Sequence, residues 1–188
     1  VTMTVLRTST GAELSLPMKR SRIVPTTVLF ERRGDVALIH LTGFNTATTD
    51  NLRAALDKAN ADIGKDLAGL IIDMRSNRGG LLDQARSVSE VFIADGMSFS
   101  TNGRHPDSKR TYRSSNGRAT TGQLPIVVLM NGGPASAAEI VAAALQDRGR
   151  AVVIGTTSYG KGTVQTVVRL ANEGELILTW SRLQAPSG

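Results

Sequence analysis

The order of the apolar segments predicts an α/β protein with a layered core. Strand-like runs rich in Val, Ile and Leu alternate along the chain with segments that carry apolar residues at helical spacing. Residues 67–74 form an apolar run, rich in Ile and Leu, that ends at Asp73 and Arg75, as strands buried on both faces of a parallel sheet do. We therefore expect a largely parallel sheet with helices packed against it.

The elements of this core are expected in order from residue 26. Strands are predicted at residues 26–30, 36–41, 67–74, 97–100, 126–130, 151–154, 163–168 and 176–180. Helices are predicted at residues 46–63, 81–94 and 136–147, with Thr49 or Asp50 capping the first. Residues 101–123 are polar and aperiodic, so we expect a mobile surface loop or a short hairpin with one strand at residues 110–113.

The first 24 residues stand apart from this pattern. Residues 2–7 and 13–18 alternate in polarity on either side of a Ser-Thr-Gly turn, which predicts a β-hairpin. Pro25 and the basic cluster before it mark a boundary between the hairpin and the core at residues 25–188. Because the chain begins inside the first strand, we expect the hairpin to be the end of a domain that lies upstream.

Composition and charge exclude several classes of function. The 188 residues carry a net charge of +6, but the basic residues are scattered and only 4% of residues are aromatic, so nucleic-acid binding is not favoured. With no Cys and two His, the chain predicts no disulfide, no metal site and no cofactor. No apolar run approaches the ~20 residues of a membrane-spanning helix.

Ser136 is the first candidate for chemistry. It follows the apolar run 126–130 and a Gly-Gly turn, and it opens an Ala-rich helical segment. Backbone N–H groups at a helix start stabilise negative charge, so a serine there can act as a nucleophile beside an oxyanion site. The alternative is a plain N-cap, since Glu139 would complete a capping box with Ser136.

Two further segments carry candidate residues. The turn Asn77-Arg78-Gly79-Gly80 follows a buried strand, where α/β sheets place their sites, and its glycines allow a backbone N–H to approach a ligand. Lys161 lies between two glycines, and Gln165 follows it by four residues, so both would share one face of a strand. The alternatives are an ordinary strand-to-helix turn and an exposed lysine in a hairpin turn.

A conventional Ser-His-Asp triad requires a histidine near the serine. His40 lies within an apolar strand and His105 in the polar loop, and neither stands in a site-like sequence. The nucleophile-elbow pattern G-x-S-x-G is also absent around Ser136. Asp73 and Asp147 could be electrostatic partners, but each is as easily an ordinary strand-end or helix-end residue. A Ser-Lys pair fits the available residues better than Ser-His-Asp.

Three motifs together resemble the carboxyl-terminal processing (tail-specific) serine peptidases. They are GLIIDMRSNRGGLL at residues 69–82, NGGPASAAE at residues 131–139 and GTTSYGKGTVQ at residues 155–165. The resemblance runs from about residue 24 to residue 188, with the motifs in the family's order and spacing. It implies a Ser-Lys endopeptidase with a ClpP/crotonase-like core, and it implies that residues 1–24 are the last strands of a PDZ domain.

The resemblance also implies roles for individual residues. Ser136 matches the nucleophile, Lys161 the general base and Gln165 the residue that positions the lysine. Asp147 falls where an acidic residue of the family has been weighed as a third catalytic member. The oxyanion hole is matched by the backbone of Gly79 and Ala137, with Gly80 as a further candidate.

Partners and location follow from the same resemblance. It implies protein or peptide substrates with apolar C-termini, no nucleic acid, and export to the bacterial periplasm or cell envelope, or to the thylakoid lumen. The signal sequence would then lie outside these 188 residues. A peripheral position at a membrane and the oligomeric state stay open.

A second reading is a catalytically silent core that binds peptides by strand addition at a sheet edge. The presence of both Ser136 and Lys161 argues against it, because a binding module needs neither. Two residues depart from the family's usual pattern, Arg78 and Pro134, and neither departure removes a catalytic group. For the peptidase, we expect Lys161 on a strand with its ammonium directed at the Ser136 hydroxyl.

Overall fold

The main sheet of the computed structural model has the strand order β3-β4-β5-β8-β9. The structure describes residues 1–21, 23–114 and 119–188. The strands are β3 (Val28–Arg33), β4 (Val36–Leu41), β5 (Gly69–Asp73), β8 (Ile126–Met130) and β9 (Val152–Gly155). β4, β5, β8 and β9 run parallel, and β3 pairs antiparallel with β4 at the edge.

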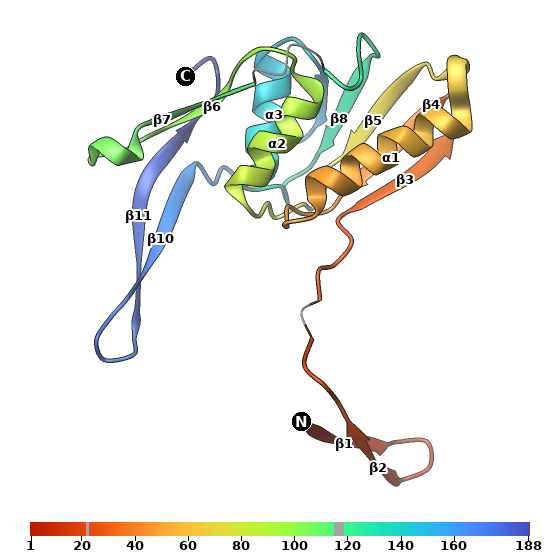
Figure 1. Ribbon diagram of the computed structural model, residues 1–188, viewed down its shortest axis with the longest axis vertical. Coiled ribbons are helices and arrows are strands. Elements are labelled where there is room, and N and C mark those ends of the chain that lie inside the picture. Colours follow the sequence, from red (N-terminus) through yellow and green to blue (C-terminus); the bar gives the residue numbers. More distant parts are fainter. Residues whose placement is uncertain (22, 115–118) are drawn as a thin grey trace.

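Helices α1 (Thr48–Ile63), α2 (Leu82–Phe92) and α3 (Ala137–Asp147) pack on this sheet (Figure 1). The parallel strands follow one another across the sheet in chain order, so right-handed crossovers place these helices on the same face. The apolar stripe predicted for the first helix is buried as expected, at Leu52, Ala55, Leu56, Ala59 and Ile63. The α/β class is therefore confirmed.

The strand predicted at residues 67–74 to be buried on both faces is β5, where only Ile71 is half-buried. Alternate residues of β4 and β8, such as Leu38 and Leu129, are half-buried, so the sheet is partly open on one face.

The predicted cap of the first helix was wrong. Neither Thr49 nor Asp50 caps α1. The Thr48 hydroxyl instead accepts the Asn45 N–H at 2.8 Å, because the chain turns through residues 45–47 before the helix begins.

A second sheet has the order β10-β11-β6-β7. It joins β6 (Gly96–Asn102), β7 (Arg110–Ser114), β10 (Thr163–Arg169) and β11 (Glu175–Gln184). Of the two structures predicted for residues 101–123, a mobile loop or a short hairpin with a strand at residues 110–113, the structure shows the hairpin, because β7 pairs antiparallel with β6. The short 3-10 helix η2 (Pro106–Ser108) lies between these strands, and residues 115–118 lie outside the described residues. Figure 1 shows β10 and β11 as a ribbon that extends beyond the rest of the sheet.

The predicted N-terminal hairpin forms from β1 (Thr2–Arg7) and β2 (Ala12–Pro17), which pair antiparallel. Figure 1 shows it apart from the core, at the end of an extended linker. Within this linker Arg22 lies outside the described residues.

A short 3-10 helix, η1 (Gly64–Asp66), follows α1 in the core. Across the described residues, no helix has both the length and the apolar character to cross a membrane.

Candidate active site

Ser136 lies at the junction between the loop after β8 and the start of α3. Its backbone has φ 55° and ψ −116°, a region that costs a residue with a side chain roughly 1–3 kcal/mol. The helix begins at the next residue, Ala137, whose N–H has no acceptor among the described residues. The strained turn therefore exposes the serine at the positive end of a helix, beside a free amide donor.

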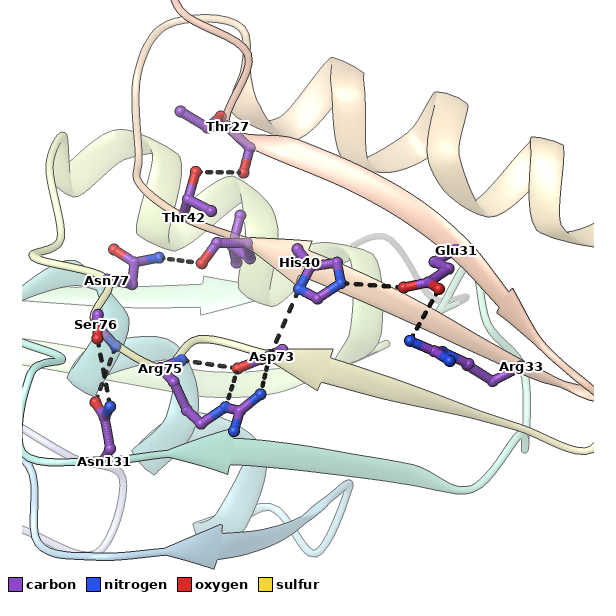
Figure 2. A network of polar contacts seen from close by, with 11 residues as sticks. Thr27, Glu31, Arg33, His40, Thr42, Asp73, Arg75, Ser76, Asn77 and Asn131 are labelled. Atoms are coloured by element: carbon purple, nitrogen blue, oxygen red, sulfur yellow. Dashed lines mark hydrogen bonds and ion pairs between the residues drawn. The ribbon is translucent and has the colours of Figure 1, made fainter.

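The loops that follow β5 and β8 are joined by hydrogen bonds. Asn131 Oδ1 accepts the Ser76 N–H at 2.9 Å and the Gly133 N–H at 3.0 Å, and the Ala135 N–H donates to Asn77 O at 3.1 Å. Figure 2 shows Asn131 beside Ser76 at the ends of their strands. Because these strands are neighbours in a parallel sheet, their carboxyl ends bring the two predicted motifs together.

Gly79 packs directly against the backbone around Ser136. A methyl group at this position would lie 2.5 Å from Ala135 O and 2.9 Å from the Ala137 nitrogen, and the backbone has φ +85°. Only glycine fits such a position. The resulting close approach places the Gly79-Gly80 turn next to Ser136.

The Gly79 N–H, expected as an oxyanion donor, donates instead to Asn77 Oδ1 at 2.8 Å. Asn77 is fully buried, and its amide nitrogen donates in turn to Leu41 O at 2.7 Å, as Figure 2 shows. The Gly80 N–H has no acceptor in the described part of the chain. Of the three amides predicted for the oxyanion hole, those of Gly80 and Ala137 are therefore without an acceptor among the described residues, whereas that of Gly79 is occupied.

Glu139 connects the serine to the lysine segment. Its Oε2 accepts the Ser136 N–H at 2.8 Å and the Lys161 N–H at 2.9 Å. Its Oε1 accepts the Gly160 N–H at 2.6 Å and the Ser158 hydroxyl. The sequence suggested this carboxylate as part of a capping box, but its contacts with residues 158–161 depend on tertiary structure that no local pattern encodes.

Lys161 lies in the loop before β10, so the expectation that it stands on a strand was wrong. Gly160, at φ +84°, and the hydrogen bonds to Glu139 hold this segment out of the sheet. The Lys161 side chain is exposed, and its ammonium makes no hydrogen bond or ion pair with the described residues. Gln165 is on β10 as predicted, and its side chain is also exposed.

A pocket of about 200 Å³ contains both Ser136 and Lys161. Apolar side chains make much of its wall: Phe99, Ile140, Ala143, Leu183 and Ala185. Gln165 is not among its lining residues, and neither is a histidine. The structure therefore brings the predicted nucleophile and base to one apolar pocket, with Gln165 outside it.

His40 belongs to a separate polar network on the main sheet (Figure 2). It lies 3.6 Å from a carboxylate oxygen of Glu31 and 3.6 Å from one of Asp73. Hydrogen bonds from the Arg75 guanidinium, the shorter at 2.7 Å, hold the pKa of Asp73 below its ordinary value of 3.8. Asp73 is thus a structural partner of Arg75, and it is the last residue of β5, the strand that precedes the Gly79-Gly80 turn.

Metal-ligand groupings are also missing from this region. Within residues 1–21, 23–114 and 119–188, no cluster of three or more His, Asp or Glu side chains could hold a metal ion. The polar side chains that line the pocket are those of Ser136, Glu139, Lys161 and Gln184.

Comparison with known proteins places this arrangement in a family. The model of "Peptidase family S41" matches residues 35–188. The chain belongs to peptidase family S41. It is 41% identical, over its whole length, to the carboxy-terminal-processing protease of Bartonella bacilliformis, and 32% identical to a probable CtpA-like serine protease of Staphylococcus aureus.

The fold is that of solved S41 proteases. The structure of a photosystem II D1 C-terminal processing protease superposes with a TM-score of 0.75 at 27% identity, covering 96% of this chain and 49% of that one. The chain spans 43% of the Bartonella relative and 37% of the Staphylococcus relative, less than half of either. The family expected from the three motifs is confirmed.

Proposed function

We propose that this S41 chain is the catalytic part of a serine endopeptidase of the carboxyl-terminal processing type. The observation that carries the proposal is the single apolar pocket that holds Ser136, at a helix start, together with Lys161. The two named relatives, both called proteases, support it.

In the proposed mechanism, Ser136 Oγ attacks the carbonyl carbon of the scissile peptide bond. The Lys161 amine, in its neutral form, accepts the hydroxyl proton. The oxyanion receives hydrogen bonds from the Ala137 N–H and from the Gly79-Gly80 turn. The intermediate collapses as Lys161 returns its proton to the leaving amine, which leaves an ester on Ser136.

The second half of the reaction uses the same groups. A water molecule attacks the ester carbonyl, Lys161 takes one of its protons, and that proton passes to Ser136 Oγ as the acid product leaves. Gln165 is proposed to orient the lysine once substrate draws the loop toward β10. The Gly79 N–H would serve as a donor only after release from Asn77, so the Gly80 and Ala137 amides are the first candidates.

The pocket supports substrates with a small or medium apolar residue before the scissile bond. Most of the side chains away from Ser136, Glu139 and Lys161 are apolar, and a volume of about 200 Å³ accommodates an aliphatic side chain. Cleavage near the C-terminus agrees with the name of the Bartonella relative, and the preference for apolar C-termini is a proposal for this protein alone.

The remaining proposals concern organisation and place. The hairpin β1–β2 is proposed to be the end of a PDZ domain, and residues 25–188 to be a ClpP/crotonase-like core. We place the protein in the bacterial periplasm or cell envelope, with a peripheral membrane position and the oligomeric state open.

The test is hydrolysis of an unfolded protein that ends in apolar residues, compared with the same protein ending in two aspartates. We expect cleavage of the first, slower cleavage of the second, and none of either by Ser136→Ala. A catalytically silent peptide-binding core, the alternative, would bind the apolar tail equally well with and without Ser136 and cleave nothing.

A further inference from the structure

The pocket runs along one face of α3. Ser136 precedes the helix, and Ile140 and Ala143 line the pocket one and two turns further on. Residues three to four apart share a helix face, so the next residue of this series is Asp147, the last residue of α3. Asp147 therefore continues this face of α3 at the helix end farthest from the serine, next to the lining residues but not one of them.

Distance excludes Asp147 from the reaction itself. α3 has 11 residues, and an α-helix rises about 1.5 Å per residue, so Asp147 lies ~16 Å along the axis from Ser136. No side chain of aspartate length spans that gap to the Ser136 hydroxyl. The carboxylate must act, if it acts, through something else.

Its contact is with the backbone of the segment after β11. Asp147 Oδ2 accepts the Ser187 N–H at 2.8 Å, and residues 185–188 form a turn closed by the Gly188 N–H donating to Ala185 O at 2.9 Å. Ala185, at the start of this turn, lines the pocket together with Leu183 and Gln184. The Asp147 carboxylate thus connects the C-terminal end of α3 to the turn at residues 185–188, which begins at the lining residue Ala185.

We propose that Asp147 is a positioning residue that fixes the far wall of the substrate pocket and thereby limits the side chain the pocket accepts. The part of this inference that concerns substrate side chains rests on the proposed peptidase function, whereas the part that concerns the turn at residues 185–188 does not. Without the hydrogen bond, the turn at residues 185–188 is free to move away from α3, and the pocket opens beside Ala143. Larger apolar side chains then fit, while Ser136 and Lys161 keep their places.

The role requires a hydrogen-bond acceptor and not a charge. Asparagine at this position keeps an acceptor oxygen of the same reach, whereas alanine removes it. A catalytic or electrostatic aspartate would show the opposite pattern, because asparagine would then be as damaging as alanine. The pair Asp147→Asn and Asp147→Ala therefore separates the two roles, and Gln146→Ala, an exposed neighbour on the same turn, is the matched control.

The first readout needs no activity. Amide hydrogen exchange of residues 183–188, followed by mass spectrometry, should be about fivefold faster in Asp147→Ala, since one hydrogen bond of ~1 kcal/mol is lost. Asp147→Asn and Gln146→Ala should exchange like the unsubstituted chain. Unchanged exchange in Asp147→Ala, or equally fast exchange in Asp147→Asn, would overturn the proposal.

The second readout is specificity, measured as kcat/KM for two peptides with Ala or Phe before the scissile bond. In Asp147→Ala the preference for Ala over Phe should fall about tenfold, while kcat for the Ala peptide stays within a few-fold. A fall in kcat with an unchanged preference would refute the positioning role. If the unsubstituted protein cleaves neither peptide, the proposed function fails, and the exchange result still decides whether Asp147 holds the wall.

Discussion

The two halves of the candidate site are built in different ways. The nucleophile half comprises Ser136, Ala137 and the Gly79-Gly80 turn. It is enclosed by backbone contacts and by the buried Asn77, between two neighbouring parallel strands. The base half, residues 158–162, is a largely exposed loop between the two sheets.

The contacts between these halves are few and specific. Glu139 accepts hydrogen bonds from both, and the Tyr159 N–H donates to Pro134 O at 3.0 Å. Pro134, one of the two departures from the family pattern, thus takes part through its carbonyl. The difference teaches that packing fixes the serine, whereas the lysine loop is held by the Glu139 carboxylate, by the bond to Pro134 O and by a second backbone bond, from the Leu183 N–H to Gly162 O at 2.8 Å.

The largest effect is expected from the base itself. Lys161→Ala should lower the rate of peptide hydrolysis by ~10³ or more, because nucleophile and base act as a unit. Lys161→Arg should not restore it, since a guanidinium stays protonated. Initial rates with a quenched fluorescent peptide measure both. Substantial turnover by Lys161→Ala would remove the lysine from the mechanism.

Two glycines, one in each half, test the difference in packing. Gly79 and Gly160 have nearly the same backbone, φ +85° and +84°, but a methyl group meets nothing within 4 Å at Gly160. Alanine costs about 1 kcal/mol of strain at either site, and at Gly79 it also overlaps Ala135 O.

We expect kcat/KM to fall by ~10² or more in Gly79→Ala and by less than about tenfold in Gly160→Ala, since only the first disturbs the oxyanion site. The melting temperature should follow the same order. Equal losses in the two variants would show that the nucleophile half is not the rigid one.

Glu139→Gln tests the link between the halves. The glutamine side chain replaces one acceptor oxygen by a donor, so two of the N–H or O–H groups that face the carboxylate lose their partner. We expect kcat to fall by about 10–100-fold and amide exchange of residues 158–162 to quicken, with α3 still protected. The control is Glu175→Gln, an exposed residue on β11 that should change neither. Faster exchange throughout α3 would mean that Glu139 holds the helix rather than the loop.

The smallest effect is expected on the free energy of unfolding, from the Asp73–Arg75 ion pair at the end of β5. Arg75 lowers the pKa of Asp73 in the folded state, so this pair stabilises the fold above the ordinary carboxyl value near 3.8 and loses its contribution as pH falls through the lowered value. Arg75→Gln should have a smaller free energy of unfolding than the unsubstituted protein at pH 7. This difference should disappear in strong acid, where Asp73 is protonated in both proteins. Urea titrations at several pH values measure it. A deficit that persists unchanged to pH 2 would exclude the carboxylate as its source.

The sequence predicted those helices and strands whose bounds depend on neighbouring residues in the chain. The start of α3 at Ser136 follows from a strand, a Gly-Gly turn and an Ala-rich helix in succession, and the strand at residues 126–130 has the bounds that the structure shows. The role of Glu139 and the occupied Gly79 N–H were not predictable, because both depend on hydrogen bonds made across the fold.

The placement of Lys161 failed for a related reason. Its strand-like neighbours at residues 163–168 suggested that the strand included the lysine, but a left-handed Gly160 and tertiary bonds end the pairing at Thr163. The pairing of β11 with β6 is likewise long-range, so the second sheet could be predicted only as separate strands.

The claim that Ser136 and Lys161 act as one catalytic unit is tested most directly by a double-mutant cycle. The measurement is kcat/KM for one quenched peptide in Ser136→Ala, Lys161→Ala and the double variant. If the two residues act as a unit, the double variant is no slower than either single variant. A double variant that loses the product of the two single losses would show that they contribute independently, and would contradict the Ser-Lys dyad.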